Sequence, residues 1–262
     1  MIKVLVNGAA GKMGLAMSAG IAAEKDMQIV AACDVRNTGR CLGELCGADI
    51  IVVIENDLQK AIEISEPDVI LDLTNPQVVK QNVITAVRNK VPVVVGTTGL
   101  TDDDKAELAV MSLENNAPVF IVPNFAIGAI LMMRFAAEAA KYMPDVEIIE
   151  MHHNQKLDAP SGTAAMTMEL IAQNREPHIQ GAVNEKEKIA GSRGGDYEGI
   201  KVHSVRLPGF VASQEVIFGG TGQVLKIRHD SISRESFIPG VLLAIRKVQS
   251  LNGVVCGLDS VM

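Results

Sequence analysis

The sequence predicts an α/β fold in which a Rossmann-type doubly wound parallel sheet is joined to an α+β domain with a mainly antiparallel sheet. Three observations support this prediction. Short β-branched runs alternate with helical patterns through residues 1–122, a glycine-rich turn follows the first run, and three later strand-like runs follow one another without helices. Alternation is typical of parallel sheets with right-handed crossovers, whereas strands in direct succession are typical of antiparallel sheets.

The first domain begins with the run IKVLV, which has the continuous apolar character of a buried parallel strand. Five similar runs follow, and helical patterns separate most of them. The predicted strands are residues 2–6, 28–33, 50–54, 69–73, 91–95 and 119–122, and the predicted helices are residues 12–23, 57–64, 77–89 and 101–115.

The pattern changes after Pro123. Residues 180–199 are rich in glycine and charge, which predicts a mobile surface loop. The other elements expected are helices 127–143, 163–174 and 234–250, and strands 146–151, 200–207, 213–218 and 223–228. Because the last helix is expected to return to the first domain, we predict a dinucleotide-binding domain over 1–125 and 235–262. Residues 126–234 then form a domain for substrate binding and oligomerisation.

Composition limits the classes of function. The 262 residues are 48% hydrophobic but only 3% aromatic, so the cores must consist mainly of aliphatic side chains and methionine. A formal net charge of -7 argues against a general nucleic-acid-binding protein, which needs clustered lysine and arginine. No apolar stretch reaches the roughly 18 residues of a membrane span, and no signal peptide is evident. Four cysteines without metal-ligand spacing are expected to be reduced thiols in a cytoplasmic protein.

A glycine-rich turn, GAAGKMG, follows the first strand and runs from Gly8 to Gly14. Glycines allow a tight turn and a close approach of the backbone to a pyrophosphate, and the following helix offers N–H donors at its N-terminus. Three glycines also occur in ordinary turns. The position between a strand and a helix nevertheless favours a dinucleotide site.

Two residues near the end of the second strand bear on the choice of cofactor. Asp34 lies twenty residues after Gly14, where an acidic side chain accepts hydrogen bonds from the adenine ribose. Its charge disfavours a 2′-phosphate, whereas Arg36 could attract one, although a solvated loop arginine is the simpler interpretation of Arg36. We predict that NADH and NADPH are both used, with NADH at least competitive.

Two further segments follow predicted strands, Gly96-Thr97-Thr98-Gly99 and Pro123-Asn124-Phe125. Ligands of open α/β sheets bind at the carboxyl ends of the strands. Both segments could be plain turns, but their position favours contact with the cofactor.

Proton-transfer and cationic groups are densest in the segment EMHHNQKLDAPSGT, residues 150–163. Lys156 and the N-terminus of a helix starting near Ser161 would form an anion site, a role compatible with a plain N-cap at Ser161. A histidine can supply a proton near neutral pH, although adjacent histidines on a strand point to opposite faces and one could be structural. Zinc is an alternative explanation of the histidines, but no third ligand is evident at suitable spacing.

With GAAGKMG, GTTG and PNF in the same order, the segment EMHHNQKLDAPSGTA resembles the 4-hydroxy-tetrahydrodipicolinate reductase (dihydrodipicolinate reductase) family. The resemblance covers essentially the whole chain. It implies that hydride from NADH or NADPH reduces a cyclic dicarboxylate with loss of water, in the diaminopimelate route to lysine. It also implies a homotetramer built through the antiparallel sheets.

The resemblance assigns roles to individual residues. His152 falls on the family's proton donor/acceptor and Lys156 on its proton donor. Substrate-binding positions fall on His153, Gly162 and Thr163, to which the expected anion site adds Ser161. The nucleotide site falls on Gly8, Ala9, Ala10, Gly11, Lys12, Met13, Asp34, Gly96, Thr97, Thr98, Val122, Pro123, Asn124 and Phe125, to which we add Arg36. Ala10 stands where the family often has glycine, and Asp34 where it often has the longer glutamate.

Two other functions remain as alternatives. A homoserine or aspartate dehydrogenase would share the first domain, but it does not account for the segment HHNQKLDAPSGT. A regulator that senses NAD(H) would need a module for binding a partner or DNA, and no basic helix-turn-helix pattern is visible.

Overall fold

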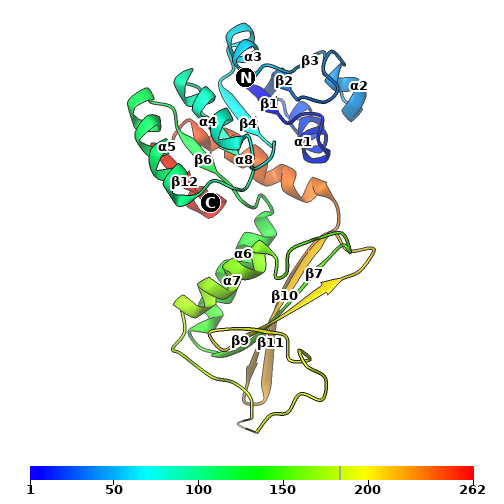
Figure 1. The fold of residues 1–262 in the computed structure, drawn as a ribbon, viewed down its shortest axis with the longest axis vertical. Coiled ribbons are helices and arrows are strands. Elements are labelled where there is room, and N and C mark those ends of the chain that lie inside the picture. Colours follow the sequence, from blue (N-terminus) through cyan, green and yellow to red (C-terminus); the bar gives the residue numbers. More distant parts are fainter. Residues whose placement is uncertain (183) are drawn as a thin grey trace. The chain divides into compact units, whose positions relative to one another are not determined.

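The computed structural model describes residues 1–182 and 184–262, and the chain divides into two compact units. Unit 1 comprises Met1–Phe125 and Arg234–Met262, and unit 2 comprises Ala126–Ser233. In Figure 1, unit 1 holds the blue to green elements up to β6 together with the orange helix α8 and the red C-terminal elements. Unit 2 is therefore one continuous insertion in the chain of unit 1. The assignment of cofactor binding to unit 1, and of substrate binding and oligomerisation to unit 2, stays a prediction.

Unit 1 is built on a seven-stranded parallel sheet with the order β12-β6-β5-β4-β1-β2-β3. Apart from β12, this is the 3-2-1-4-5-6 order of a doubly wound dinucleotide-binding sheet. The strands are β1 (Ile2–Asn7), β2 (Met27–Cys33), β3 (Ile54–Glu55), β4 (Val69–Asp72), β5 (Val93–Val95), β6 (Val119–Ile121) and β12 (Val254–Cys256). The parallel sheet confirms the first part of the predicted fold class.

Helices cover both faces of this sheet, as Figure 1 shows. On one face, α3, α4 and α5 pack on the aliphatic side chains of the strands in a single buried cluster. On the other face, α8 contacts β4, β5 and β6 and also packs against α1. The helices of unit 1 are α1 (Lys12–Ala22), α2 (Leu42–Cys46), α3 (Leu58–Ser65), α4 (Val79–Arg88), α5 (Asp102–Asn115) and α8 (Ile238–Val248), with 3-10 helices η1 (Arg234–Phe237) and η2 (Leu258–Val261). Burial on both faces explains why the strands read as unbroken apolar runs.

Unit 2 contains a five-stranded sheet with the order β11-β10-β7-β9-β8. Strands β7 and β9 pair in parallel and the other pairs are antiparallel, so the sheet is mainly antiparallel, as predicted. Helices α6 (Ile127–Ala140) and α7 (Gly162–Gln173) pack on each other and on the sheet. The strands are β7 (Asp145–His152), β8 (Gly195–Tyr197), β9 (Ile200–Arg206), β10 (Ala212–Gly220) and β11 (Gln223–Ser231).

The structure corrects several predicted elements. The strand predicted over 50–54 is wrong for all but its last residue, since β3 is Ile54–Glu55. Helix α2 and strands β8 and β12 are not predicted at all, and β8 lies inside the segment 180–199. Val183, in the same segment, lies outside the described residues. The helix predicted over 234–250 is η1 followed by α8.

Candidate active site

The glycine-rich turn after β1 has a backbone that requires glycine. Gly8 has φ +84°, and a Cβ there would lie 2.5 Å from the carbonyl oxygen of Leu73. A Cβ on Gly14, in the first turn of α1, would lie 2.2 Å from the carbonyl oxygen of Gly8. Gly11 is the N-cap of α1 and has an extended backbone. The turn therefore packs tightly on the neighbouring strand end and presents the N-terminus of a helix, the arrangement that suits a pyrophosphate.

Asp34 fixes this turn from the end of β2. Its carboxylate accepts hydrogen bonds from the backbone N–H groups of Ala10 at 3.0 Å and Arg36 at 2.8 Å. The Arg36 side chain is exposed, with its Nε 3.5 Å from the same carboxylate. One terminal nitrogen of Arg36 lies 3.5 Å from where a Cβ on Gly11 would stand, so the guanidinium lies over the turn. One acidic and one basic group thus lie beside the glycine-rich turn.

A cavity of about 830 Å³ opens beside the turn within unit 1. Of the predicted residues, Gly8, Asp34 and Arg36 line it. The wall also contains Asn7, Cys33, Val35, Asn56, Asp57, Leu58, Gln59, Leu73, Thr74, Asn75, Val78, Asn82 and Thr85. Burial, with nearby carboxylates, raises the pKa of the Cys33 thiol to about 12, so this thiol stays protonated and unreactive. The volume and the polar wall suit a nucleotide.

A buried carboxylate, Asp72, connects several strand ends at this edge of the sheet. It is completely buried, and it accepts hydrogen bonds from Asn7 Nδ2 (2.9 Å), Asn82 Nδ2 (2.8 Å) and Thr97 Oγ1 (2.8 Å). Both the N–H and the hydroxyl of Thr74 also donate to it. The ends of β1, β4 and β5 are therefore held together by one anion. Sequence reasoning missed Asp72 because it reads as the last residue of an apolar strand.

The segments after β5 and β6 meet each other. A Cβ on Gly96 would lie 2.7 Å from the ring of Phe125, which is itself buried. Val122 is fully buried, whereas Thr98 and Pro123 are exposed. These segments do not line the 830 Å³ cavity. They are connected to its wall indirectly, through the hydrogen bond that Thr97 donates to Asp72.

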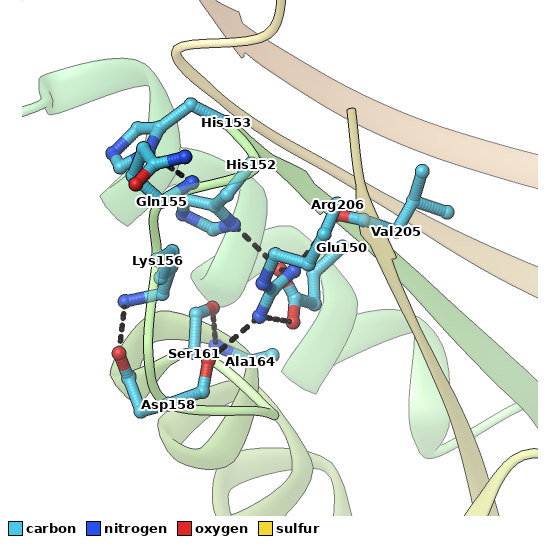
Figure 2. A network of polar contacts seen from close by, with 10 residues as sticks. All are labelled: Glu150, His152, His153, Gln155, Lys156, Asp158, Ser161, Ala164, Val205 and Arg206. Atoms are coloured by element: carbon cyan, nitrogen blue, oxygen red, sulfur yellow. Dashed lines mark hydrogen bonds and ion pairs between the residues drawn. The ribbon is translucent and has the colours of Figure 1, made fainter. Parts of the chain in front are cut away.

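In unit 2, a buried ion cluster centres on Glu150 (Figure 2). The Nδ1 of His152 lies 2.5 Å from Glu150 Oε2, and Arg206 of β9 donates to both carboxylate oxygens, at 2.9 and 2.7 Å. Glu150 is completely buried, while 15% of the His152 side chain is exposed. Burial alone would raise the pKa of Glu150, but hydrogen bonds from His152, Arg206 and Ser204 outweigh it and hold the pKa at about 2. The carboxylate is therefore ionised at every working pH.

The loop after β7 carries the other predicted groups. His153 is exposed, and its Nδ1 accepts a hydrogen bond from the backbone N–H of Gln155 at 3.3 Å. Lys156 Nζ lies 2.8 Å from the carboxylate of Asp158, as Figure 2 shows, and this ammonium lowers the pKa of Asp158. Arg206 also donates to the backbone carbonyl of Asp158 at 2.8 Å. The ion cluster is thus tied to the loop that carries Lys156.

Helix α7 begins where the sequence predicts an anion site. Ser161 is its N-cap, and the buried hydroxyl accepts a hydrogen bond from Ala164 N–H at 3.2 Å. Gly162 is exposed, and a Cβ there would meet nothing within 4 Å, so the helix start is open to a ligand. Thr163 is partly exposed in the same turn. The positive end of the helix dipole therefore lies at an accessible surface.

The predicted residues fall into two groups. All the predicted cofactor-binding residues belong to unit 1, and all the predicted catalytic and substrate-binding residues belong to unit 2. Within the described ranges, no three His, Cys, Asp or Glu side chains are grouped as a metal site, and no helix is long and apolar enough to cross a bilayer. Glu150 and Arg206 are the residues of unit 2 that sequence reasoning missed as parts of the site. A Glu two residues before a His on a strand, hence on the same face, is the signal for Glu150.

Comparison with known proteins identifies relatives over the whole chain. Residues 2–125 match the family model described as dihydrodipicolinate reductase, N-terminus, and residues 128–262 match the model described as dihydrodipicolinate reductase, C-terminus. The 4-hydroxy-tetrahydrodipicolinate reductase of Desulfitobacterium hafniense is 53% identical over 261 residues, which are 99% of this chain and 98% of the relative. The enzyme of the same name from Syntrophomonas wolfei is 49% identical over the same shares.

A solved structure is similar as well. It is described as dipicolinate-bound dihydrodipicolinate reductase from Paenisporosarcina sp. TG-14, with a TM-score of 0.89 and 45% sequence identity, covering 100% of both chains.

Proposed function

The chain belongs to the dihydrodipicolinate reductase family, and we propose how its residues serve the reaction of that family. The enzyme is an oxidoreductase that reduces 4-hydroxy-tetrahydrodipicolinate to tetrahydrodipicolinate in the diaminopimelate route to lysine. In the overall reaction a hydride replaces the hydroxyl group, and that group leaves with a proton as water. The protein must therefore bind a nicotinamide cofactor, bind a dicarboxylate, and handle a proton.

The nicotinamide cofactor, when bound, supplies the hydride, and the chemistry of that transfer belongs to the cofactor. The turn from Gly8 to Met13 and the N-terminus of α1 would hold its pyrophosphate, because the glycines leave no side chain between backbone and ligand. Asp34 would turn from the N–H of Ala10 towards the adenine ribose. Gly96 to Thr98 and Val122 to Phe125 would contact the remainder of the cofactor.

Cofactor preference follows from the charges beside the ribose. The carboxylate of Asp34 repels a 2′-phosphate, whereas Arg36, whose guanidinium lies over the turn, attracts one. The enzyme therefore accepts both NADH and NADPH, with NADH at least competitive. Measurement of kcat/KM for both cofactors tests this, and a preference for NADPH above about a thousandfold, about 4 kcal/mol, contradicts it.

The observation that supports the substrate site best is the grouping of His152, Lys156 and the N-terminus of α7 in one segment of unit 2. Lys156 and the helix start, with Ser161, Gly162 and Thr163, bind the carboxylates of the substrate, and His153 contributes from the loop. The related structure from Paenisporosarcina is described as bound to dipicolinate, which is a small cyclic dicarboxylate. His152 and Lys156 supply the proton that the reaction requires.

A coupled assay tests this function. Aspartate semialdehyde and pyruvate are mixed with a dihydrodipicolinate synthase and this enzyme, and oxidation of NADH and NADPH is followed by absorbance. Oxidation that depends on all four components is the expected result. Reduction of NAD⁺ with homoserine or aspartate as the substrate, and no NADH oxidation that depends on the synthase, would favour the dehydrogenase alternative.

We propose in addition that the protein forms a homotetramer through the sheets of unit 2. The supporting feature is the edge strand β11, where Val224 and Leu225 expose 65% and 40% of their surface. Light scattering coupled to gel filtration gives the mass directly. A mass near the 27.9 kDa of one chain contradicts the proposal.

A further inference from the structure

We propose that Glu150 is a positioning residue for the reaction, because its carboxylate fixes the orientation and protonation pattern of His152 so that Nε2 faces the substrate. The inference rests on the proposed role of His152 as proton donor and extends it. Glu150 itself would not touch the substrate.

The geometry leaves Glu150 little freedom. Its Oε2 contacts His152 Nδ1 at 2.5 Å and Arg206 at 2.9 Å, and its Oε1 contacts Arg206 at 2.7 Å. The paired contact with the guanidinium fixes the plane of the carboxylate. Because the carboxylate is completely buried and held by both oxygens, it holds the imidazole on Nδ1 in one orientation.

The charge state then decides which nitrogen carries the proton. Hydrogen bonds from His152, Arg206 and Ser204 keep the pKa of Glu150 at about 2 despite its burial, so the carboxylate only accepts hydrogen bonds. The Nδ1 of His152 must therefore carry a hydrogen in both the neutral and the cationic imidazole. The proton that is gained and lost is the one on Nε2, which points away from the carboxylate.

A second ion cluster on β7, centred on Glu147, provides a comparison within the same sheet. Glu147 also contacts a histidine and an arginine, with His203 Nε2 at 2.9 Å and Arg193 at 2.7 Å. Its side chain is 29% exposed, whereas that of Glu150 is fully buried. Burial of an ion cluster contributes little net stability, since desolvation offsets the attraction between the charges. Complete burial against His152, in the segment proposed to bind the substrate, therefore favours a positioning role.

Arg206 extends the effect beyond His152. The guanidinium that holds Glu150 also donates to the carbonyl of Asp158, in the loop that presents Lys156. One ion cluster thus sets the position of the proton donor and anchors the loop with the second cationic group. Loss of Glu150 should disturb both, with the larger effect on His152.

The charged groups around His152 show which one holds its imidazole. They are Glu150 on its own strand, Arg206 on β9, and Lys156, Asp158 and His153 in the loop, while β10 places the neutral Ala212 opposite His152. Glu150 is the anion in direct contact with the ring. In Glu150→Gln this anion is lost and Arg206 is left uncompensated, so the imidazole loses the charged partner that orients it.

Kinetics of three single variants test the proposal. Glu150→Gln should lower kcat about 10- to 100-fold, a typical effect of removing a partner that orients a functional histidine, with little change in KM. Glu150→Asp keeps the charge and should lower kcat less than Glu150→Gln does. The matched control is Glu147→Gln, which removes the corresponding carboxylate from the second cluster and should leave kcat near that of the wild type.

A double-mutant cycle separates positioning from other effects. If Glu150 acts mainly through His152, adding Glu150→Gln to His152→Gln should lower kcat much less than Glu150→Gln lowers it in the wild type. An equal loss of kcat in both backgrounds overturns the positioning proposal. A His152→Gln variant with wild-type kcat overturns the proposed function instead, so the two failures are distinguishable.

The wild-type enzyme gives an answer even if Glu150→Gln fails to fold. Two-bond ¹H–¹⁵N spectra of the enzyme with labelled histidine report which ring nitrogen carries the proton, and comparison with His152→Gln identifies the resonances. In its neutral form, His152 should carry its proton on Nδ1. A proton on Nε2 overturns the proposal.

Discussion

Replacement of His152 and replacement of Lys156 should have different effects on kcat and KM. Proton donation contributes about 10²- to 10⁴-fold to the rate of many enzymes, so His152→Gln should lower kcat by about that factor and change KM modestly. Lys156→Ala should raise KM as well as lower kcat, because the ammonium also binds a carboxylate. Steady-state kinetics check both, with His178→Gln as control, since His178 pairs with Asp145 instead. Wild-type kcat in both variants would refute the assignment.

Asp72 allows a prediction for the cofactor site. In Asp72→Ala, the donors of Asn7, Asn82 and Thr97 lose their shared acceptor. A buried unsatisfied polar group costs about 1–3 kcal/mol, so the free energy of unfolding should fall and NADH should bind more weakly. Urea unfolding and fluorescence titration with NADH measure the two effects. The control variant is Asp68→Ala. In the wild type, the carboxylate of Asp68 accepts an exposed hydrogen bond from the N–H of Lys3. Unchanged NADH affinity in Asp72→Ala would contradict the prediction that Asp72 supports the cofactor site.

Single residues differ in how far the sequence predicts their place. The spacing between Gly14 and Asp34 predicts that an acidic group lies beside the glycine turn, and the structure has Asp34 bonded to Ala10 there. The partners of Glu150 could not be predicted in the same way. Arg206 lies 56 residues further along the chain, and only the parallel pairing of β7 with β9 places it against Glu150.

At the scale of elements, two N-caps provide a matched comparison. Ser161 caps α7 at the proposed substrate site, and Thr101 caps α5 in a capping box with Asp104. Replacement of either by alanine should lower the free energy of unfolding by about 0.5–2 kcal/mol. Only Ser161→Ala should also raise KM for the dicarboxylate. Denaturation and steady-state kinetics of both variants check this. An equal effect of the two substitutions on KM would contradict an anion site at the N-terminus of α7.

Some elements are predictable because the sequence marks their ends. The predicted helix 101–115 and the observed α5, Asp102–Asn115, agree because a capping residue marks the start. Strands β12 and β3 have no such mark. They have three and two residues, and their pairing with β6 and β2 arises from tertiary packing. The run 50–54 is as apolar as a strand, yet only Ile54 joins one, and the side chain of Ile51 is 94% exposed.

The whole molecule should lose stability in acid. The pKa of Glu150 is lowered to about 2 by its hydrogen bonds, from an ordinary value of 4.5. A carboxyl group with a lowered pKa stabilises the folded state fully above its unfolded pKa, and this contribution disappears as the pH falls from about 4.5 towards 2. Urea unfolding at several pH values should show the decline, and Glu150→Gln should flatten it. A variant as acid-sensitive as the wild type would contradict the predicted contribution of Glu150.

The insertion of unit 2 into unit 1 has a consequence for biosynthesis of the protein on the ribosome. Unit 2 is one contiguous stretch, so all of its strands and helices have been synthesised once Ser233 has been added. Unit 1 is different, because α8, which covers one face of its sheet, and β12, which pairs with β6, come from Arg234–Met262. Domains generally fold as units during synthesis. The second unit to begin emerging is therefore the first that can complete its fold. The parallel sheet of unit 1 keeps an unpaired edge at β6, and a face without α8, until residues 234–262 have been synthesised.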